Sequence, residues 1–201
     1  MTNTGHKHKA IFSALKILGG PPLPNGFTLA DVLLEQPVTL QPGQWLSTAI
    51  PVALFQQTEP DKVQLILPQS APETLQLTLQ GTPLPIPTQP ALLISQDLAT
   101  LGGLLFAARH WQAAGLEMVA ALQLPQPAPF QPMPARIWLP AMPHEALATL
   151  PLLEDWGIPN RLASPEGRPG CFEGSVLALA KHFTYHSKQA FAQVLFNEKP
   201  S

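Results

Sequence analysis

The sequence is short of charged side chains. Asp, Glu, Lys and Arg make up 12% of the 201 residues, whereas a soluble domain has about 25%. The 11 basic and 13 acidic residues give a formal net charge of -2, which offers no basic patch for nucleic acid or an anionic membrane surface. We therefore predict neither nucleic-acid binding nor membrane insertion. We expect the weakly charged surface to contact a protein partner or a second copy of the chain.

Cysteine is almost absent, and long apolar runs are missing. The single cysteine, Cys171, excludes a disulfide within the chain, and it is too few for an iron-sulfur cluster, which needs about four thiolates. Prolines and glutamines interrupt every apolar stretch before it reaches the roughly 18 residues of a membrane span. Because Met1 to Lys9 is polar and no small-residue cleavage site follows it, we expect a cytoplasmic protein in which residues 1–9 are flexible.

Proline, by contrast, is abundant. Twelve of its 25 copies cluster at residues 21–24, 83–90 and 125–134. Because proline lacks a backbone N–H donor, such clusters mark linkers and strand edges. Four segments before residue 80 carry apolar side chains at the spacing of strands: Phe27–Leu34, Trp45–Leu54, Val63–Leu67 and Thr74–Leu79. Residues 10–88 are therefore expected to form a small antiparallel β-barrel or sandwich.

Residues 89–201 carry the signals of a parallel α/β domain. The apolar strand Ala91–Ile94 precedes a helical pattern that starts at Leu98 and ends at Gly115, and Glu117–Leu122 is a second strand. Strand, helix and strand in this order form a βαβ unit. Further on we expect a strand at 136–139, a helix at 144–156 that Pro151 breaks, and a strand at 160–163. A glycine-rich loop at 167–174 follows them, and a last strand is expected at 192–196.

Three short strings, in the correct order, resemble motifs of the ferredoxin reductase-like flavoproteins. Pro42-Gly43-Gln44-Trp45 is similar to the PGQF or PGQW turn that opens a barrel strand in that family, and Gly81-Thr82-Pro83-Leu84 resembles the GPLG turn that ends the flavin domain. Residues 91–110 have the spacing of the family's a-L-L-I-G-G-G-I-G-x-A-P-L segment and the helix after it. The resemblance implies a flavin-domain-like β-barrel followed by a trimmed, nucleotide-binding-like α/β domain.

Within that family, the later part of the chain is most similar to the electron transfer subunits of dihydroorotate dehydrogenase. Residues 136–147 and 158–166 resemble segments of those subunits, and Gly170 to Gly174 falls where they begin a four-cysteine iron-sulfur loop. The likeness covers residues 25–201 and implies that 89–201 retains a remnant of that loop.

The resemblance also points to the positions that contact cofactors in the family: Pro42, Gly43, Gln44, Ser95, Gln96, Asp97 and Gly102. Family members hold the flavin phosphate with the arginine of an R-x-[YF]-[ST] motif, but the first arginine of this chain is Arg109. The phosphate-binding glycines are replaced by Ser95, Gln96 and Asp97, and a carboxylate at a helix start repels phosphate.

We therefore predict a degenerate family member without an iron-sulfur cluster, bound cofactor, metal or catalytic residue, which binds a protein partner or itself and is not an enzyme. One alternative is a flavin- or NAD(P)H-dependent oxidoreductase that holds FAD or NAD(P) through backbone N–H groups at Ser95–Gly103 and at the Pro42–Trp45 turn. Another is a small-ligand-binding protein that uses the cleft between the domains. His182 and His186 share one helix-like spacing but lack a third metal ligand.

Overall fold

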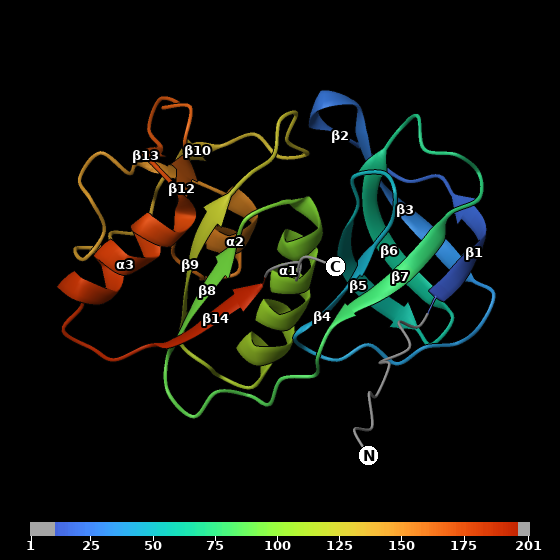
Figure 1. The fold of residues 1–201 in the computed structure, drawn as a ribbon, viewed down its shortest axis with the longest axis horizontal. Helices are drawn as coiled ribbons and strands as arrows, with labels where there is room; N and C mark the ends of the chain where they lie inside the picture. Colours follow the sequence, from blue (N-terminus) through green and yellow to red (C-terminus); the bar gives the residue numbers. More distant parts are fainter. Residues whose placement is uncertain (1–10, 197–201) are drawn as a thin grey trace, which may run out of the picture.

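The computed structural model describes residues 11–196, and the predicted flexible segment 1–9 lies outside them. Figure 1 shows two sheets side by side, with the long helix α1 (Leu98–Ala113) between them. The antiparallel sheet comes from the first half of the chain and the parallel sheet from the second half, so the predicted fold class is confirmed.

The first sheet has seven antiparallel strands in the order β4-β7-β1-β3-β6-β5, with β2 paired to β3. Inward-facing Val63, Leu65 and Leu67 of β6 are at most 2% exposed, as the alternation in that strand predicts. The strands are β1 (Ile11–Leu18), β2 (Pro22–Leu23), β3 (Phe27–Leu34), β4 (Gln44–Ser47), β5 (Ala53–Glu59), β6 (Lys62–Pro68) and β7 (Gln76–Gly81).

One predicted strand of this sheet is wrong. Trp45–Leu54 is not a single strand, because the chain leaves β4 after Ser47 and starts β5 only at Ala53. Pro51 lies in the gap and cannot donate to a ladder. The two strands end up at opposite ends of the strand order, so the break lets the chain cross from one edge of the sheet to the other.

The second sheet has five parallel strands in the order β13-β12-β9-β8-β14. In chain order, β8 comes first, β9, β12 and β13 follow on one side of it, and β14 lies on its other side. The order therefore reverses between β8 and β14, which is where doubly wound sheets place their ligands. The strands are β8 (Ala91–Ser95), β9 (Met118–Gln123), β12 (Asn160–Ser164), β13 (Phe172–Glu173) and β14 (Ala192–Phe196).

The parallel sheet is covered on both faces. In β8, Ala91 and Leu93 pack in the core that contains α1, whereas Leu92 and Ile94 pack in the core that contains α3 (Val176–His186). This two-sided burial explains why the strand reads as an unbroken apolar run. α1 is itself buried on nearly all sides because it contacts β4 and β5 of the first sheet as well as β8, β9 and β14.

Two sequence expectations for the second half need correction. Residues 136–139 form no strand, because the backbone N–H groups of Arg136 and Ile137 donate to the Glu154 carboxylate. The expected helix at 144–156 starts only at Pro151 as the short α2 (Pro151–Asp155), because proline suits the first turn of a helix. Residues 148–149 before it form β11, which pairs with β10 (Met133–Pro134). Helix α3 was not expected at all.

Candidate functional site

The loop after β8 sits at the start of α1 and is held by its own side chains. Asp97 is the N-cap residue: its Oδ1 accepts hydrogen bonds from the backbone N–H of Thr100 at 2.8 Å and from Thr100 Oγ1 at 2.8 Å. Thr100 Oγ1 in turn accepts from the backbone N–H of Asp97 at 3.1 Å. This reciprocal capping box places a carboxylate at the positive end of the helix dipole.

Ser95 and Gln96 complete this loop. Ser95 is fully buried, and its Oγ donates to the carbonyl of Asp97 at 3.4 Å. The backbone N–H of Gln96 donates to Thr100 Oγ1 at 3.3 Å. The predicted residues Ser95, Gln96 and Asp97 therefore lie together, but their polar groups are engaged in bonds within the loop. Backbone N–H groups at a helix start are what a phosphate would need.

Gly102 lies one turn into α1 and packs against the first sheet. A Cβ added there would lie 2.3 Å from the backbone nitrogen of Leu54 in β5, and one added to the neighbouring Gly103 would lie 3.1 Å from Trp45 and Phe196. Both glycines thus allow the helix to approach β4 and β5 closely. The structure supplies a packing reason for Gly102, and its contact with a cofactor stays a prediction.

The Pro42–Gln44 turn lies against the second family-like turn. Gly43 has a φ of +90°, a conformation that favours glycine, and the backbone N–H of Leu84 donates to the carbonyl of Pro42 at 2.8 Å. Gln44 Oε1 accepts from the backbone N–H of Gln41 at 3.0 Å. The turn that starts β4 and the turn after β7 are therefore joined. Within residues 11–196, no hydrogen bond or ion pair links Pro42, Gly43 or Gln44 to the Ser95–Asp97 loop.

Two aromatic residues that the sequence did not single out as a pair meet between the sheets. Trp45 of β4 and Phe196 at the end of β14 pack edge to face with ring centroids 6.5 Å apart, and they are 5% and 1% exposed. Phe196 stands at the carboxyl end of a strand beside the reversal point of the parallel sheet. The indole nitrogen of Trp45 is buried without a hydrogen-bond partner in the described part of the chain.

The first sheet carries few cations and no arginine. Lys62 is the only lysine or arginine between Lys16 and Arg109, and its Nζ pairs with Asp31 Oδ2 at 3.4 Å. Hydrogen bonding from Gln64, helped by Lys62, holds the pKa of Asp31 below its ordinary value. A flavin pyrophosphate would therefore find no guanidinium on this sheet, only Lys62, which already has a carboxylate partner, and the exposed Lys16 of β1.

No family model matches the sequence, and no curated protein is significantly similar to it. Two solved structures superpose well. The cytochrome P450 reductase GcoB of Amycolatopsis has a TM-score of 0.53 and 12% identity over 92% of this chain and 61% of that chain. An NADH-dependent reduced ferredoxin-NADP oxidoreductase has a TM-score of 0.50 and 13% identity over 87% of this chain and 64% of that chain.

The fold is ferredoxin reductase-like.

This likeness confirms the two-domain architecture, with sheets that correspond to the FAD- and NAD-binding domains of such reductases. The chain spans less than two thirds of the length of either neighbour. Neither neighbour is a dihydroorotate dehydrogenase subunit, so the closer resemblance to those subunits stays a prediction. The loop around Cys171, which that resemblance compares with an iron-sulfur loop, forms β13 and the turns on either side of it.

The other candidate residues lie apart from one another. Cys171 is half-buried, and burial raises the pKa of its thiol, an effect that Arg168 partly offsets. His182 and His186 do share one face of α3, with ring centroids 4.3 Å apart. Within residues 11–196 no group of three or more His, Cys, Asp or Glu side chains could hold a metal ion. Nor does this part of the chain contain a helix long and apolar enough to cross a membrane.

A buried ionic network fixes the segment after β10. The Glu154 side chain is fully buried and accepts from the backbone N–H groups of Arg136 at 3.0 Å and of Ile137 at 3.2 Å. The Arg161 guanidinium donates to the carbonyls of Asn160 and Ile137, at 2.7 Å each. Burial lowers the pKa of Arg161, and Glu154 partly offsets that effect. The network holds the 136–141 segment beside α2 and β12.

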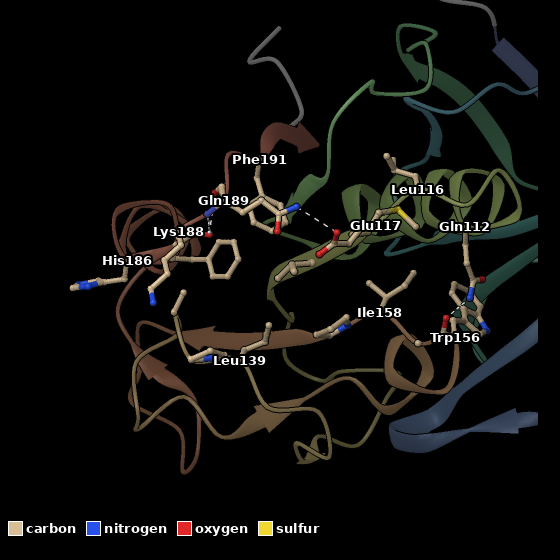
Figure 2. Close-up of a pocket in the computed structure, with 18 of the residues that line it drawn as sticks. Gln112, Leu116, Glu117, Leu139, Trp156, Ile158, His186, Lys188, Gln189 and Phe191 are labelled. Carbon is tan, nitrogen blue, oxygen red and sulfur yellow. Dashed lines mark hydrogen bonds between the residues drawn. The ribbon is translucent and has the colours of Figure 1, made fainter.

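A cavity of this ferredoxin reductase-like fold lies away from the reversal point of the sheet. It has a volume of about 830 Å³ and opens at the opposite edge, where β9 and β12 begin at Met118 and Asn160 (Figure 2). Its volume falls within the roughly 300–1,000 Å³ of small-molecule sites. No local motif marks it in the sequence, since its lining comes from four separate segments, 112–119, 139–141, 156–159 and 183–191.

Proposed function

We propose that this chain uses a ferredoxin reductase-like scaffold for binding a protein partner or a second copy of itself, without an iron-sulfur cluster and without a redox cofactor. The observation that carries the proposal is the Asp97 capping box at the start of α1. A nucleotide phosphate placed there would meet a carboxylate, and the N–H groups of Gln96, Asp97 and Thr100 already have partners. Like charges at such short range are unfavourable.

The lack of a guanidinium on the first sheet supports the same proposal. Flavin phosphates are commonly bound by guanidinium groups, which supply charge and two directed donors. Here the sheet offers two lysines in their place, Lys62, which Asp31 already pairs, and the exposed Lys16 of β1. Two independent positions, the start of α1 and the first sheet, therefore support the proposal that the chain lacks the family's cofactor contacts.

Exposed aromatic residues support partner binding. Trp138 is 69% exposed and Tyr185 is 84% exposed, and aromatic side chains are enriched in protein interfaces. The ring of Trp138 stacks on that of His144 with centroids 6.3 Å apart, so a large flat surface faces solvent. Together with the low content of charged residues, these exposed aromatic side chains support the proposal that the surface of the chain binds a protein partner.

The enzyme alternative is a flavin- or NAD(P)H-dependent oxidoreductase that transfers electrons. The fold favours it, because both structural neighbours are reductases by name. Backbone N–H groups of the Ser95–Gly103 and Pro42–Trp45 segments would have to bind the cofactor in place of the missing arginine.

A spectrum and a ligand-shift series separate the two proposals. We expect purified protein to be colourless, and FAD, FMN, NADH and NADPH at about 0.5 mM to leave the melting temperature unchanged. A ligand at ten times its Kd adds about 1.4 kcal/mol of stability, which raises the melting temperature of a protein of this size by about 3–6 °C. A shift of that size, or a flavin spectrum, would refute the cofactor-free proposal and favour the oxidoreductase.

A further inference from the structure

The 830 Å³ cavity has an apolar floor from both faces of the parallel sheet. Met118 and Ile158 belong to the core that contains α1, whereas Val119 and Phe183 belong to the core that contains α3. Half-buried side chains flank this floor, from the ends of helices and from the segment that the Glu154 network holds: Leu116, Leu139, Trp156 and Phe191. The cavity can therefore desolvate an apolar body of aromatic or aliphatic groups.

One rim of the cavity carries a carboxylate that is fixed in place. Glu117, directly before β9, accepts a hydrogen bond through Oε2 from Gln189 Nε2 at 3.3 Å, across the rim between the two sequence segments (Figure 2). Gln189 is itself held by Ser187, whose Oγ donates to its carbonyl at 3.0 Å and accepts from its backbone N–H at 3.3 Å. Glu117 has no cationic partner within 4.0 Å in the described part of the chain.

The electrostatic environment of Glu117 adds to its negative charge. The carboxyl end of the 16-residue helix α1 borders the cavity at Gln112 and Leu116, and this end of a helix carries partial negative charge. The cations of the region stand elsewhere: Lys188 and His186 line the other end of the cavity, and Arg109 lies over Trp156 at 5.6 Å, outside the lining (Figure 2). A ligand cation is therefore favoured near Glu117 and disfavoured at the Lys188 end.

The end of the cavity away from Lys188 is bounded by a contact between two helices (Figure 2). Gln112 Nε2 near the end of α1 donates to the carbonyl of Trp156, which directly follows α2. The indole of Trp156 packs against Phe55 of the first sheet with ring centroids 6.3 Å apart. The wall at this end is therefore tied to both sheets, which makes the cavity a fixed feature of the fold.

From these observations we propose that the cavity binds a small organic amine, in which a protonated nitrogen pairs with Glu117 and an aromatic or aliphatic body lies on the Met118, Ile158 and Phe183 floor. The site is at the amino ends of the strands, away from the Ser95–Asp97 loop, so it does not depend on whether a nucleotide binds. The cavity would thus give the protein a small-molecule site in addition to the protein-binding surface that we propose.

Three probes of equal shape test the charge assignment: 4-phenylbutylamine, 4-phenyl-1-butanol and 4-phenylbutyrate, titrated into isotope-labelled protein and followed by amide chemical shifts. We expect the amine to bind about tenfold more tightly than the butyrate, with the largest shifts at Leu116, Met118, Ile158 and Phe191. Preference for the butyrate overturns the assignment of the ligand charge. Binding of none of the three, or shifts confined to other surfaces, overturns the site itself.

A matched pair of variants tests the role of the carboxylate. Glu117→Gln should weaken amine binding about fivefold, the factor that about 1 kcal/mol from a partly solvated ion pair gives. It should leave binding of the neutral alcohol unchanged. Glu35→Gln removes the same charge from an exposed position on the first sheet and should change neither affinity. An equal loss of affinity in both variants, or none in Glu117→Gln, would show that Glu117 does not recognise the amine.

Discussion

Gly102 in α1 lies close to the backbone of β5, and this contact can be tested with one methyl group. In an exposed helix, replacing glycine by alanine stabilises by about 1 kcal/mol. Here the added Cβ would lie 2.3 Å from the backbone nitrogen of Leu54, so the helix or the strand must move. Overpacking of this kind costs about 1–3 kcal/mol, and we take the upper end because the contact is with backbone.

The net expectation for Gly102→Ala is a loss of about 2 kcal/mol, which lowers the melting temperature by about 4–8 °C in a protein of this size. Gly103→Ala meets only side chains, at 3.1 Å, so its overpacking and helix terms should nearly cancel. Gly19→Ala has nothing within 4 Å and should be neutral or stabilise by up to about 1 kcal/mol.

Chemical denaturation followed by circular dichroism measures all three differences. The expected order of stability is Gly19→Ala, then Gly103→Ala, then Gly102→Ala. If Gly102→Ala proved as stable as Gly19→Ala, α1 could not be wedged between the two sheets as described, and the packing reason for that glycine would be refuted.

Three further results are expected. Glu154→Gln should destabilise the protein by about 3 kcal/mol in a urea titration, because it breaks a buried pair. Asp155→Asn should cost less than about 1 kcal/mol, because the Asp155 side chain is 60% exposed. Equal losses of stability in the two variants would contradict this. Asp97→Ala should cost about 1 kcal/mol in the same assay and Asp97→Asn little, since asparagine also caps helices. Alkylation of Cys171 by iodoacetamide should continue to accelerate as the pH rises past 9.0, the ordinary pKa of its thiol, because burial raises that pKa. A rate that reaches its plateau by pH 8 would contradict this.

The elements that local patterns specify were predictable from the sequence. Strand β3 follows the interval expected for it, from Phe27 to Leu34, and α1 starts after the Asp97 cap as the residue types indicate. Helix α3 was missed although Val176, Leu179, Ala180 and Phe183 recur at helical spacing behind the Ser175 cap. The sequence therefore contains the local signal for this helix.

Other features depend on contacts between distant residues. The 136–139 segment has the composition of a strand, but the Glu154 carboxylate takes the N–H groups that a ladder would use. The meeting of Trp45 with Phe196, and the cavity that Glu117 and Gln189 border, each join segments far apart in the sequence. No window of neighbouring residues contains that information. The family resemblance pointed instead to the loop at Ser95–Asp97 and to the Pro42–Gln44 turn.

Phe106 has a consequence for how the chain acquires its structure. This α1 residue is 2% exposed and packs in the core of the first sheet, among residues such as Val32 and Leu65. During synthesis the first seven strands leave the ribosome before the helix that completes their core. The first sheet therefore cannot complete its core until α1 has been synthesised. We expect both sheets to unfold in a single calorimetric transition.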